Sequence, residues 1–134
     1  MQKIIINTDG GSRGNPGPSG IGAVFFDENK KVIARYKEYI GEATNNIAEY
    51  KALILALTKV KDFEYNELLC RLDSELVVKQ LKGEYKVKDI ILKELHSQVQ
   101  ALIFFKPVRF EHVRREYNGI ADKLVNEAID EAGF

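Results

Sequence analysis

The sequence predicts an α/β fold, a five-stranded mixed sheet flanked by helices in the order βββαβααβα. Five apolar runs have the length of strands and end at polar or turn residues, whereas four segments carry apolar residues at helical spacing. A short turn joins two consecutive strands, and the later strands are separated by helices. Because hairpin-linked strands pair antiparallel and helix-linked strands pair parallel, we expect both kinds of pairing in one sheet.

The first elements are strands. Lys3–Asn7 is short, apolar and β-branched, which is typical of a strand buried on both faces. Gly10–Gly20 holds most of the Gly and Pro residues and predicts a loop. Gly22–Asp27 and Lys31–Tyr39 then predict a hairpin whose turn is Asp27-Glu28-Asn29-Lys30.

Helices and strands alternate in the rest of the chain. Thr44-Asn45-Asn46 indicates a helix start, and helical spacing continues to about Val60. The remaining expected elements are a strand at Glu67–Leu72, a short helix at Glu75–Lys82 that ends at Gly83, a helix at Ile90–Phe104 that ends before Pro107, a strand at Val108–Val113, and an amphipathic helix at Ile120–Ala132.

The composition is that of a single globular domain, residues 1–134. Of the 134 residues, 45% are hydrophobic and 30% charged, and no apolar run approaches the ~20 residues of a membrane helix. The single cysteine, Cys70, excludes an internal disulfide and, with only two histidines, a Cys/His zinc site. We therefore expect a cytoplasmic monomer without a membrane partner. Because 20 basic residues balance 20 acidic ones, any nucleic-acid binding must come from local charge.

Two aspartates follow apolar strands. Asp9 closes the first expected strand and Asp73 the fourth. If these strands are parallel neighbours, their ends lie about 4.7–4.9 Å apart, and ligands of open α/β sheets bind outside such ends. A helix cap or an Asx turn explains either residue equally well when it is taken alone.

Two further carboxylates lie near helix starts. Glu49 precedes Leu53 and Ala56 at helical spacing, which places it on the buried stripe of its helix. The alternative is a capping-box contact with Asn46, three residues earlier. Asp122 lies at the edge of the apolar arc of the last helix, where the helix dipole alone would account for it.

Together, the four carboxylates predict a metal site at one edge of the sheet. Ionised carboxylates gathered there would repel one another, and burial would add to the cost. Mg²⁺ resolves the conflict because it binds carboxylate oxygens, waters and phosphate oxygens, and two such ions roughly 3.5–4 Å apart form the clamp of phosphoryl transfer. We expect two Mg²⁺ ions, with Mn²⁺ as a substitute.

Four segments resemble, in order and spacing, the motifs of type 1 ribonuclease H (ribonuclease HI). They are TDGGSRGNPGPSGIGAV, TNNIAEYKALILAL, LDSELVVKQLKGEY and VRREYNGIADKLVNEA. The resemblance covers essentially the whole chain and implies the ribonuclease H fold. It also implies an endonuclease that hydrolyses the RNA strand of RNA/DNA hybrids and leaves 5′-phosphate and 3′-hydroxyl ends.

The resemblance assigns roles to particular residues. Asp9, Glu49, Asp73 and Asp122 match the catalytic, metal-binding carboxylates. The residues that match contacts to the hybrid are Gly10, Gly11, Ser12, Asn15, Thr44, Asn45, Asn46 and Ser74. Backbone amides and short polar side chains suit this task because RNA displays its 2′-hydroxyls in a wide, shallow groove. Taken alone, the GNPGP run would be an ordinary multi-turn loop, and no Gly-Lys-Ser/Thr makes it a P-loop.

The chain departs from the better-known bacterial pattern in two places. The basic protrusion that grips the DNA strand is missing, and only a short segment with Lys86 and Lys88 stands there, which fits a phosphate contact or a solvated face. No histidine lies between the last strand and Asp122, where many relatives carry a mobile catalytic one. We expect Arg114 or Arg115 to contact the departing phosphate instead.

Two other functions are compatible with parts of the pattern. One is a non-catalytic module that binds RNA/DNA hybrids or double-stranded RNA. Clustered negative charge argues against it, because carboxylates beside phosphates do not strengthen binding. The other is an integrase-like strand transfer on the same fold, which the small size and the RNA-contacting motif make less suitable.

Overall fold

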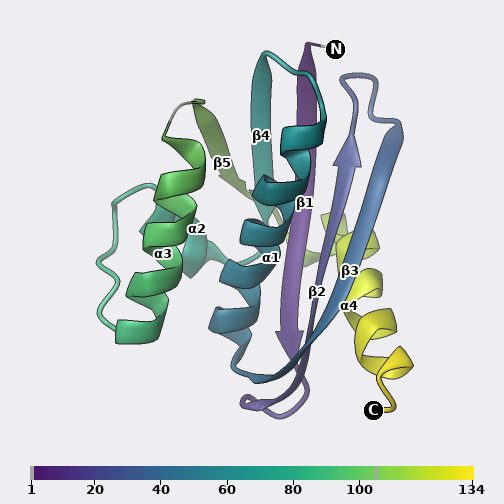
Figure 1. The fold of residues 1–134 in the computed structure, drawn as a ribbon, viewed down its shortest axis with the longest axis vertical. Coiled ribbons are helices and arrows are strands. Elements are labelled where there is room, and N and C mark those ends of the chain that lie inside the picture. Colours follow the sequence, from purple (N-terminus) through teal and green to yellow (C-terminus); the bar gives the residue numbers. More distant parts are fainter. Residues whose placement is uncertain (1, 105) are drawn as a thin grey trace.

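Five strands form one mixed sheet in the order β3-β2-β1-β4-β5 (Figure 1). The computed structural model describes residues 2–104 and 106–134. Helices α1 and α3 lie on one face of the sheet, and α4 lies on the other, against β1, β2 and β3. The expected α/β architecture and its element order are confirmed.

The element bounds lie close to those expected, with one main exception in the Gly-rich segment; the third strand also runs past the expected Tyr39 to Ala43. The strands are β1 (Lys3–Ser12), β2 (Gly17–Phe26), β3 (Val32–Ala43), β4 (Glu67–Leu72) and β5 (Val108–His112). The helices are α1 (Asn45–Lys59), α2 (Glu75–Leu81), α3 (Ile90–Ile103) and α4 (Gly119–Glu131), with 3₁₀ turns η1 (Val60–Asp62) and η2 (Arg115–Tyr117).

The exception concerns the Gly-rich segment. β1 continues through Asp9 to Ser12, and β2 begins at Gly17, so the loop expected over Gly10–Gly20 is wrong. The antiparallel ladder pairs Ser12 with Ser19, which satisfies the backbone groups of both strands. Asp9 therefore lies within β1, one residue beyond the end of its parallel ladder with β4.

Two glycines in these strands serve packing rather than turning. A Cβ on Gly10 would lie 2.2 Å from the carbonyl carbon of Ala48, so β1 and α1 are in backbone contact there. A Cβ on Gly22 would lie 2.7 Å from the Cβ of Leu124 in α4. The missing side chains let one helix approach each face of the sheet closely.

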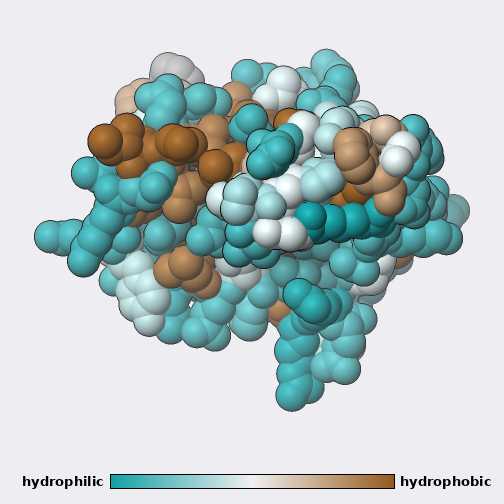
Figure 2. All heavy atoms as spheres, turned by 90° about the horizontal axis from the view of Figure 1, so that it is seen from below, coloured by the Kyte–Doolittle hydropathy of each residue, from teal (hydrophilic) through white to brown (hydrophobic). Residues whose placement is uncertain are grey.

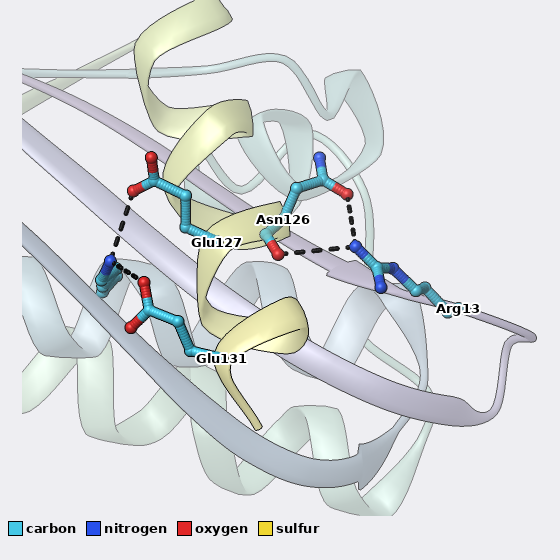
Figure 3. Close-up of polar contacts among 5 residues, drawn as sticks. Arg13, Asn126, Glu127 and Glu131 are labelled. Carbon is cyan, nitrogen blue, oxygen red and sulfur yellow. Dashed lines mark hydrogen bonds and ion pairs between the residues drawn. The ribbon is translucent and has the colours of Figure 1, made fainter. Parts of the chain in front are cut away.

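Polar contacts hold α4 on both flanks (Figure 3). Nη2 of Arg13, in the turn between β1 and β2, lies 3.1 Å from Oδ1 of Asn126 and 2.8 Å from Oδ1 of Asp130. On the other flank, Nζ of Lys37 in β3 lies 3.3 Å from Oε1 of Glu127 and also binds Glu131. These contacts fix the position of α4 along the sheet, and with it the position of Asp122 near its start.

The main core lies between the sheet and α1, α2 and α3. Ile4, Ile6, Phe25 and Leu53 have no exposed surface, and Cys70 is a buried free thiol, as its alternation in an apolar strand predicts. In the described part of the chain, no helix has the length and apolar character needed to cross a bilayer.

Candidate active site

Three carboxylates converge where the parallel ladder between β1 and β4 ends. One oxygen each of Asp9, Glu49 and Asp73 lies within 4.8 Å of the other two. Asp9 is one residue past the parallel ladder, Asp73 follows β4 directly, and Glu49 lies one turn into α1. The parallel pairing of β1 with β4, together with the close approach of α1, brings the three together.

Glu49 is held by β1 rather than by its own helix. Its Oε1 accepts a 2.7 Å hydrogen bond from the backbone N–H of Gly10. The cap of α1 is Thr44, whose Oγ1 accepts from the N–H of Ile47, so the capping-box alternative with Asn46 is wrong. Glu49 is only 5% exposed, and its Oε2 is buried without a hydrogen-bond partner among the described residues.

Asp122 lies beside this group without being part of its tight centre. It is exposed in the first turn of α4 and lines the same pocket as the three buried or half-buried carboxylates. Its negative charge helps to raise the pKa of Asp9, so the two carboxylates interact electrostatically.

The electrostatics of the cluster favour a bound cation. Burial raises the pKa of Asp9 to about 7, and the charges of Asp73 and Asp122 add to the rise. Burial also raises the pKa of Glu49 well above its usual range, and the charge of Asp9 adds to it. An unpartnered carboxylate oxygen in an all-oxygen cluster fits a hard divalent cation, which would satisfy the oxygen and offset the repulsion.

The carboxylates form one wall of a pocket of about 390 Å³. Six of the eight expected substrate-contact residues also line it: Gly10, Gly11, Ser12, Asn45, Asn46 and Ser74. The other two lie next to these residues: Oδ1 of Asn15, in the turn between β1 and β2, accepts from the N–H of Asn45 at 2.9 Å, and Thr44 is the cap of α1. The structure thus places six of the eight in the pocket and connects the other two to the start of α1.

The two arginines expected near the departing phosphate differ in position. Arg115, in η2, lines the pocket. Arg114 is largely exposed, and its Nη1 lies 3.3 Å from Oε1 of Glu116. His112 is the last residue of β5, within the strand as expected. Of the two arginines, Arg115 is therefore the better candidate for a contact with the departing phosphate.

The comparisons with known proteins agree with this arrangement. Residues 7–128 match the family described as reverse transcriptase-like. Ribonuclease H of Clostridium botulinum is 34% identical over 151 aligned residues, which cover 98% of this chain and 98% of that protein. The chain belongs to the ribonuclease H family. The resemblance noted from the four sequence motifs is confirmed.

A solved ribonuclease H also matches in three dimensions. The structure of LC11-RNase H1 in complex with an RNA/DNA hybrid superposes with a TM-score of 0.93 at 47% identity, covering 96% of this chain and 98% of the other. The bifunctional protein Rv2228c of Mycobacterium tuberculosis is 46% identical over 97% of this chain. This chain spans only 36% of the length of that relative.

The end of the molecule that is seen from below is mostly hydrophilic (Figure 2). The largest apolar area in this view lies on the side of α3, whose first residues, Ile90 and Ile91, are 82% and 57% exposed. Apart from Val125 and Ile129, the residues that line the acidic pocket are polar or glycine.

Sequence reasoning missed one residue of the site, Asn118. Its side chain is fully buried and donates a 3.0 Å hydrogen bond to Oδ2 of Asp73. An Asn directly before a helix is typical of an N-cap, so the motif offered an ordinary explanation that concealed this contact.

Proposed function

We propose that this chain is an endonuclease that hydrolyses the RNA strand of RNA/DNA hybrids with two Mg²⁺ ions, leaving 5′-phosphate and 3′-hydroxyl ends. The observation that carries the proposal is the convergence of Asp9, Glu49 and Asp73, with one buried oxygen of Glu49 left for a ligand. The hybrid complex of LC11-RNase H1, 47% identical to this chain, supports the choice of substrate.

The ions would be held by Asp9, Glu49, Asp73 and Asp122, and Mn²⁺ could replace Mg²⁺. When bound, such ions stabilise the charge of the transition state and lower the pKa of a bound water. The contribution of the chain is to hold the carboxylates close together before the cations arrive. The hydrogen bond from Gly10 fixes one oxygen of Glu49 and leaves the other for coordination.

Small residues beside the carboxylates would read the RNA strand. Gly10 and Gly11 line the pocket and would present backbone groups to a sugar edge. The N–H of Ser12 donates to Oδ1 of Asn45 at 2.9 Å, which leaves the NH₂ group of Asn45 to donate to a 2′-hydroxyl. Asn15, in the turn between β1 and β2, and Thr44, the cap of α1, would add contacts to the backbone of the hybrid, with Thr44 near a DNA-strand phosphate.

Two further residues would complete the contacts. Ser74, the cap of α2, lies next to Asp73 in the pocket and offers its remaining hydroxyl donor to the RNA strand. Arg115 would bind the departing phosphate through its planar guanidinium group, whose forked donors match phosphate oxygens.

We also propose that residues 1–134 act as a single, monomeric ribonuclease H domain in the cytoplasm. The five strands belong to one sheet, and the family match spans 7–128. The buried free thiol of Cys70 suits a reducing compartment. Gel filtration with light scattering checks the oligomeric state, for which we expect one chain per particle.

A panel of duplexes tests the proposed activity. RNA/DNA, RNA/RNA and DNA/DNA duplexes of one sequence, each labelled on one strand, are incubated with Mg²⁺, with Mn²⁺ or with EDTA. We expect cleavage of the RNA strand of the hybrid with either metal and none with EDTA. Binding of the hybrid without cleavage in either metal would instead support the non-catalytic binding module.

A further inference from the structure

The buried side chain of Asn118 joins two parts of the site. It has no exposed surface, and its Nδ2 donates to the backbone carbonyl of Thr8 at 2.8 Å and to Oδ2 of Asp73 at 3.0 Å. Thr8 is the residue before Asp9 in β1. One carboxamide therefore ties the strand that carries Asp9 to the carboxylate that follows β4.

Asn118 does not use this side chain as a helix cap. It precedes α4 directly but makes no side-chain capping bond there. Its backbone instead joins the neighbouring elements: its N–H donates to the carbonyl of Arg115 at 2.9 Å, and its carbonyl accepts from the N–H of Asp122 at 3.0 Å. The residue thus lies at the junction between η2, α4 and the two strand ends that carry Asp9 and Asp73.

The chemistry of the contact requires a neutral double donor. Both partners, a carbonyl and a carboxylate, are hydrogen-bond acceptors. The NH₂ group of Asn carries two N–H donors on one nitrogen, so it can bind both. The acceptor atom of the same side chain, Oδ1, is buried without a hydrogen-bond partner among the described residues. The unpaired Oδ1 costs stability, as does the equally unpaired Oδ1 of Asn7, so what distinguishes Asn118 is the contact of its Nδ2 with Asp73.

We propose that Asn118 is a positioning residue, which orients Asp73 for cation binding. By engaging Oδ2, it leaves Oδ1 as the oxygen for the cation and fixes the rotation of the carboxylate. Through Thr8 it keeps Asp73 in register with Asp9. This inference rests on the proposed metal-dependent function and adds to it a residue that neither the carboxylate pattern nor the family motifs assign.

The test compares Asn118→Ala with the control Asn7→Ala. Asn7 is also buried, and its Nδ2 donates to the carbonyl of Tyr117 at 3.4 Å, so it supports the same turn without touching Asp73. Mg²⁺ affinity is measured by calorimetry on the free protein, and kcat and KM are measured on a labelled hybrid. We expect Asn118→Ala to weaken Mg²⁺ binding about ten-fold or more.

The kinetics of cleavage should also show that the defect of Asn118→Ala lies in Mg²⁺ binding. For Asn118→Ala, kcat should fall at a fixed, subsaturating Mg²⁺ concentration and recover in part as Mg²⁺ is raised, while KM for the hybrid changes little. Asn7→Ala should lower the melting temperature but leave Mg²⁺ affinity close to that of the unmodified chain. Asn118→Leu keeps most of the side-chain volume and should show the same loss of Mg²⁺ affinity. It replaces Asn118→Ala in the test if the alanine variant does not fold.

Each outcome decides the proposal. Unchanged Mg²⁺ affinity in the Asn118 variants, or a loss no larger than that of Asn7→Ala, would overturn the role proposed for Asn118. The proposed cleavage activity would not be affected by that result. Failure of the unmodified chain to bind Mg²⁺ would overturn this inference together with the proposed function. If no Asn118 variant folds, the side-chain NH₂ resonances of Asn118 in the unmodified chain decide: they should shift on addition of Mg²⁺, and unshifted resonances would contradict the inference.

Discussion

The backbone N–H of Gly10 donates a 2.7 Å hydrogen bond to Oε1 of Glu49, at a point where β1 and α1 are in backbone contact. This contact holds the buried carboxylate of Glu49, a residue of α1, against the backbone of β1. It depends on the absence of a side chain at position 10, since any Cβ there would overlap the backbone of Ala48. The acidic cluster and the packing of α1 thus have a common origin in Gly10.

Gly10→Ala should therefore separate α1 from β1. We expect a loss of about 3 kcal/mol in the free energy of unfolding, because backbone atoms of Ala48 cannot move aside as a flexible side chain would. Gly119→Ala is the matched control, since a Cβ there meets nothing within 4 Å, and it should leave stability nearly unchanged. Urea unfolding of both variants measures the difference, and equal stabilities would show that β1 and α1 are not in contact at this position.

The stability of the metal-free protein should fall as the pH rises. The pKa of Asp9 rises from 3.8 to about 7 in the folded protein, mainly through burial. Between these values the folded state holds a proton that the unfolded chain has released, so each step up in pH favours unfolding. We expect a loss on the order of 2 kcal/mol from pH 4 to pH 8 in EDTA, and added Mg²⁺ should restore most of it at pH 8. A melting temperature that rises over this interval in EDTA would contradict the buried, mutually repelling cluster.

Asp9→Asn should abolish cleavage and stabilise the metal-free protein at neutral pH. The amide keeps the shape of the side chain but removes one charge from the cluster, so repulsion and desolvation both decrease. Hybrid binding should stay near that of the unmodified chain, since the contacts of the Gly10–Ser12 segment persist. A lower melting temperature in EDTA combined with normal cleavage would mean that Asp9 has only a structural role.

Much of this site could be predicted from the sequence because its parts are local. Asp73 follows an apolar strand, and Glu49 and Asp122 lie at helical spacing from apolar residues. The strand end or helix face that carries each carboxylate could therefore be predicted. The extent of β1 was not, because Gly10 and Gly11 are typical of turns and only the packing of α1 shows why they belong to a strand. Local patterns indicate what a residue favours, whereas this strand is set by contacts with distant residues.

The role of Asn118 could not be predicted for the same reason. Its partners, Thr8 and Asp73, are 110 and 45 residues away, and no periodic pattern links positions so distant. Likewise, the choice between Arg114 and Arg115 depended on the 3₁₀ turn η2, which directs only the second into the pocket region. Side-chain partners across elements became visible only in the fold.

Arg115→Ala should lower kcat, whereas Arg114→Ala should have little effect. Arg115 lines the acidic pocket, and Arg114 is exposed beside Glu116, so only the first is placed to bind a departing phosphate. We expect roughly a ten-fold fall in kcat for Arg115→Ala, with little change in KM. Single-turnover and steady-state rates on one hybrid measure the effect, and a larger loss for Arg114→Ala would reverse the assignment.

Lys86 and Lys88 test the segment that replaces the basic protrusion. Both are exposed between α2 and α3, where a phosphate backbone could contact them. If they neutralise phosphates, replacing both by Ala should reduce the slope of log K against log salt by up to about two units. Lys30 and Lys31, in the turn at the opposite end of the sheet, provide the control pair, whose replacement should leave the slope unchanged. An unaltered slope for Lys86 and Lys88 would identify the segment as a solvated face.

We propose that these carboxylates act with a divalent cation to cut RNA paired to DNA. This claim is tested by single-turnover cleavage of a hybrid with 5′-labelled RNA, compared between the unmodified chain and Asp73→Asn over a series of Mg²⁺ concentrations. We predict that cleavage by the unmodified chain rises from zero in EDTA to a plateau with Mg²⁺, and that Asp73→Asn binds the hybrid but leaves the RNA intact at every concentration. Cleavage in EDTA, or equal cleavage by Asp73→Asn, would contradict the claim.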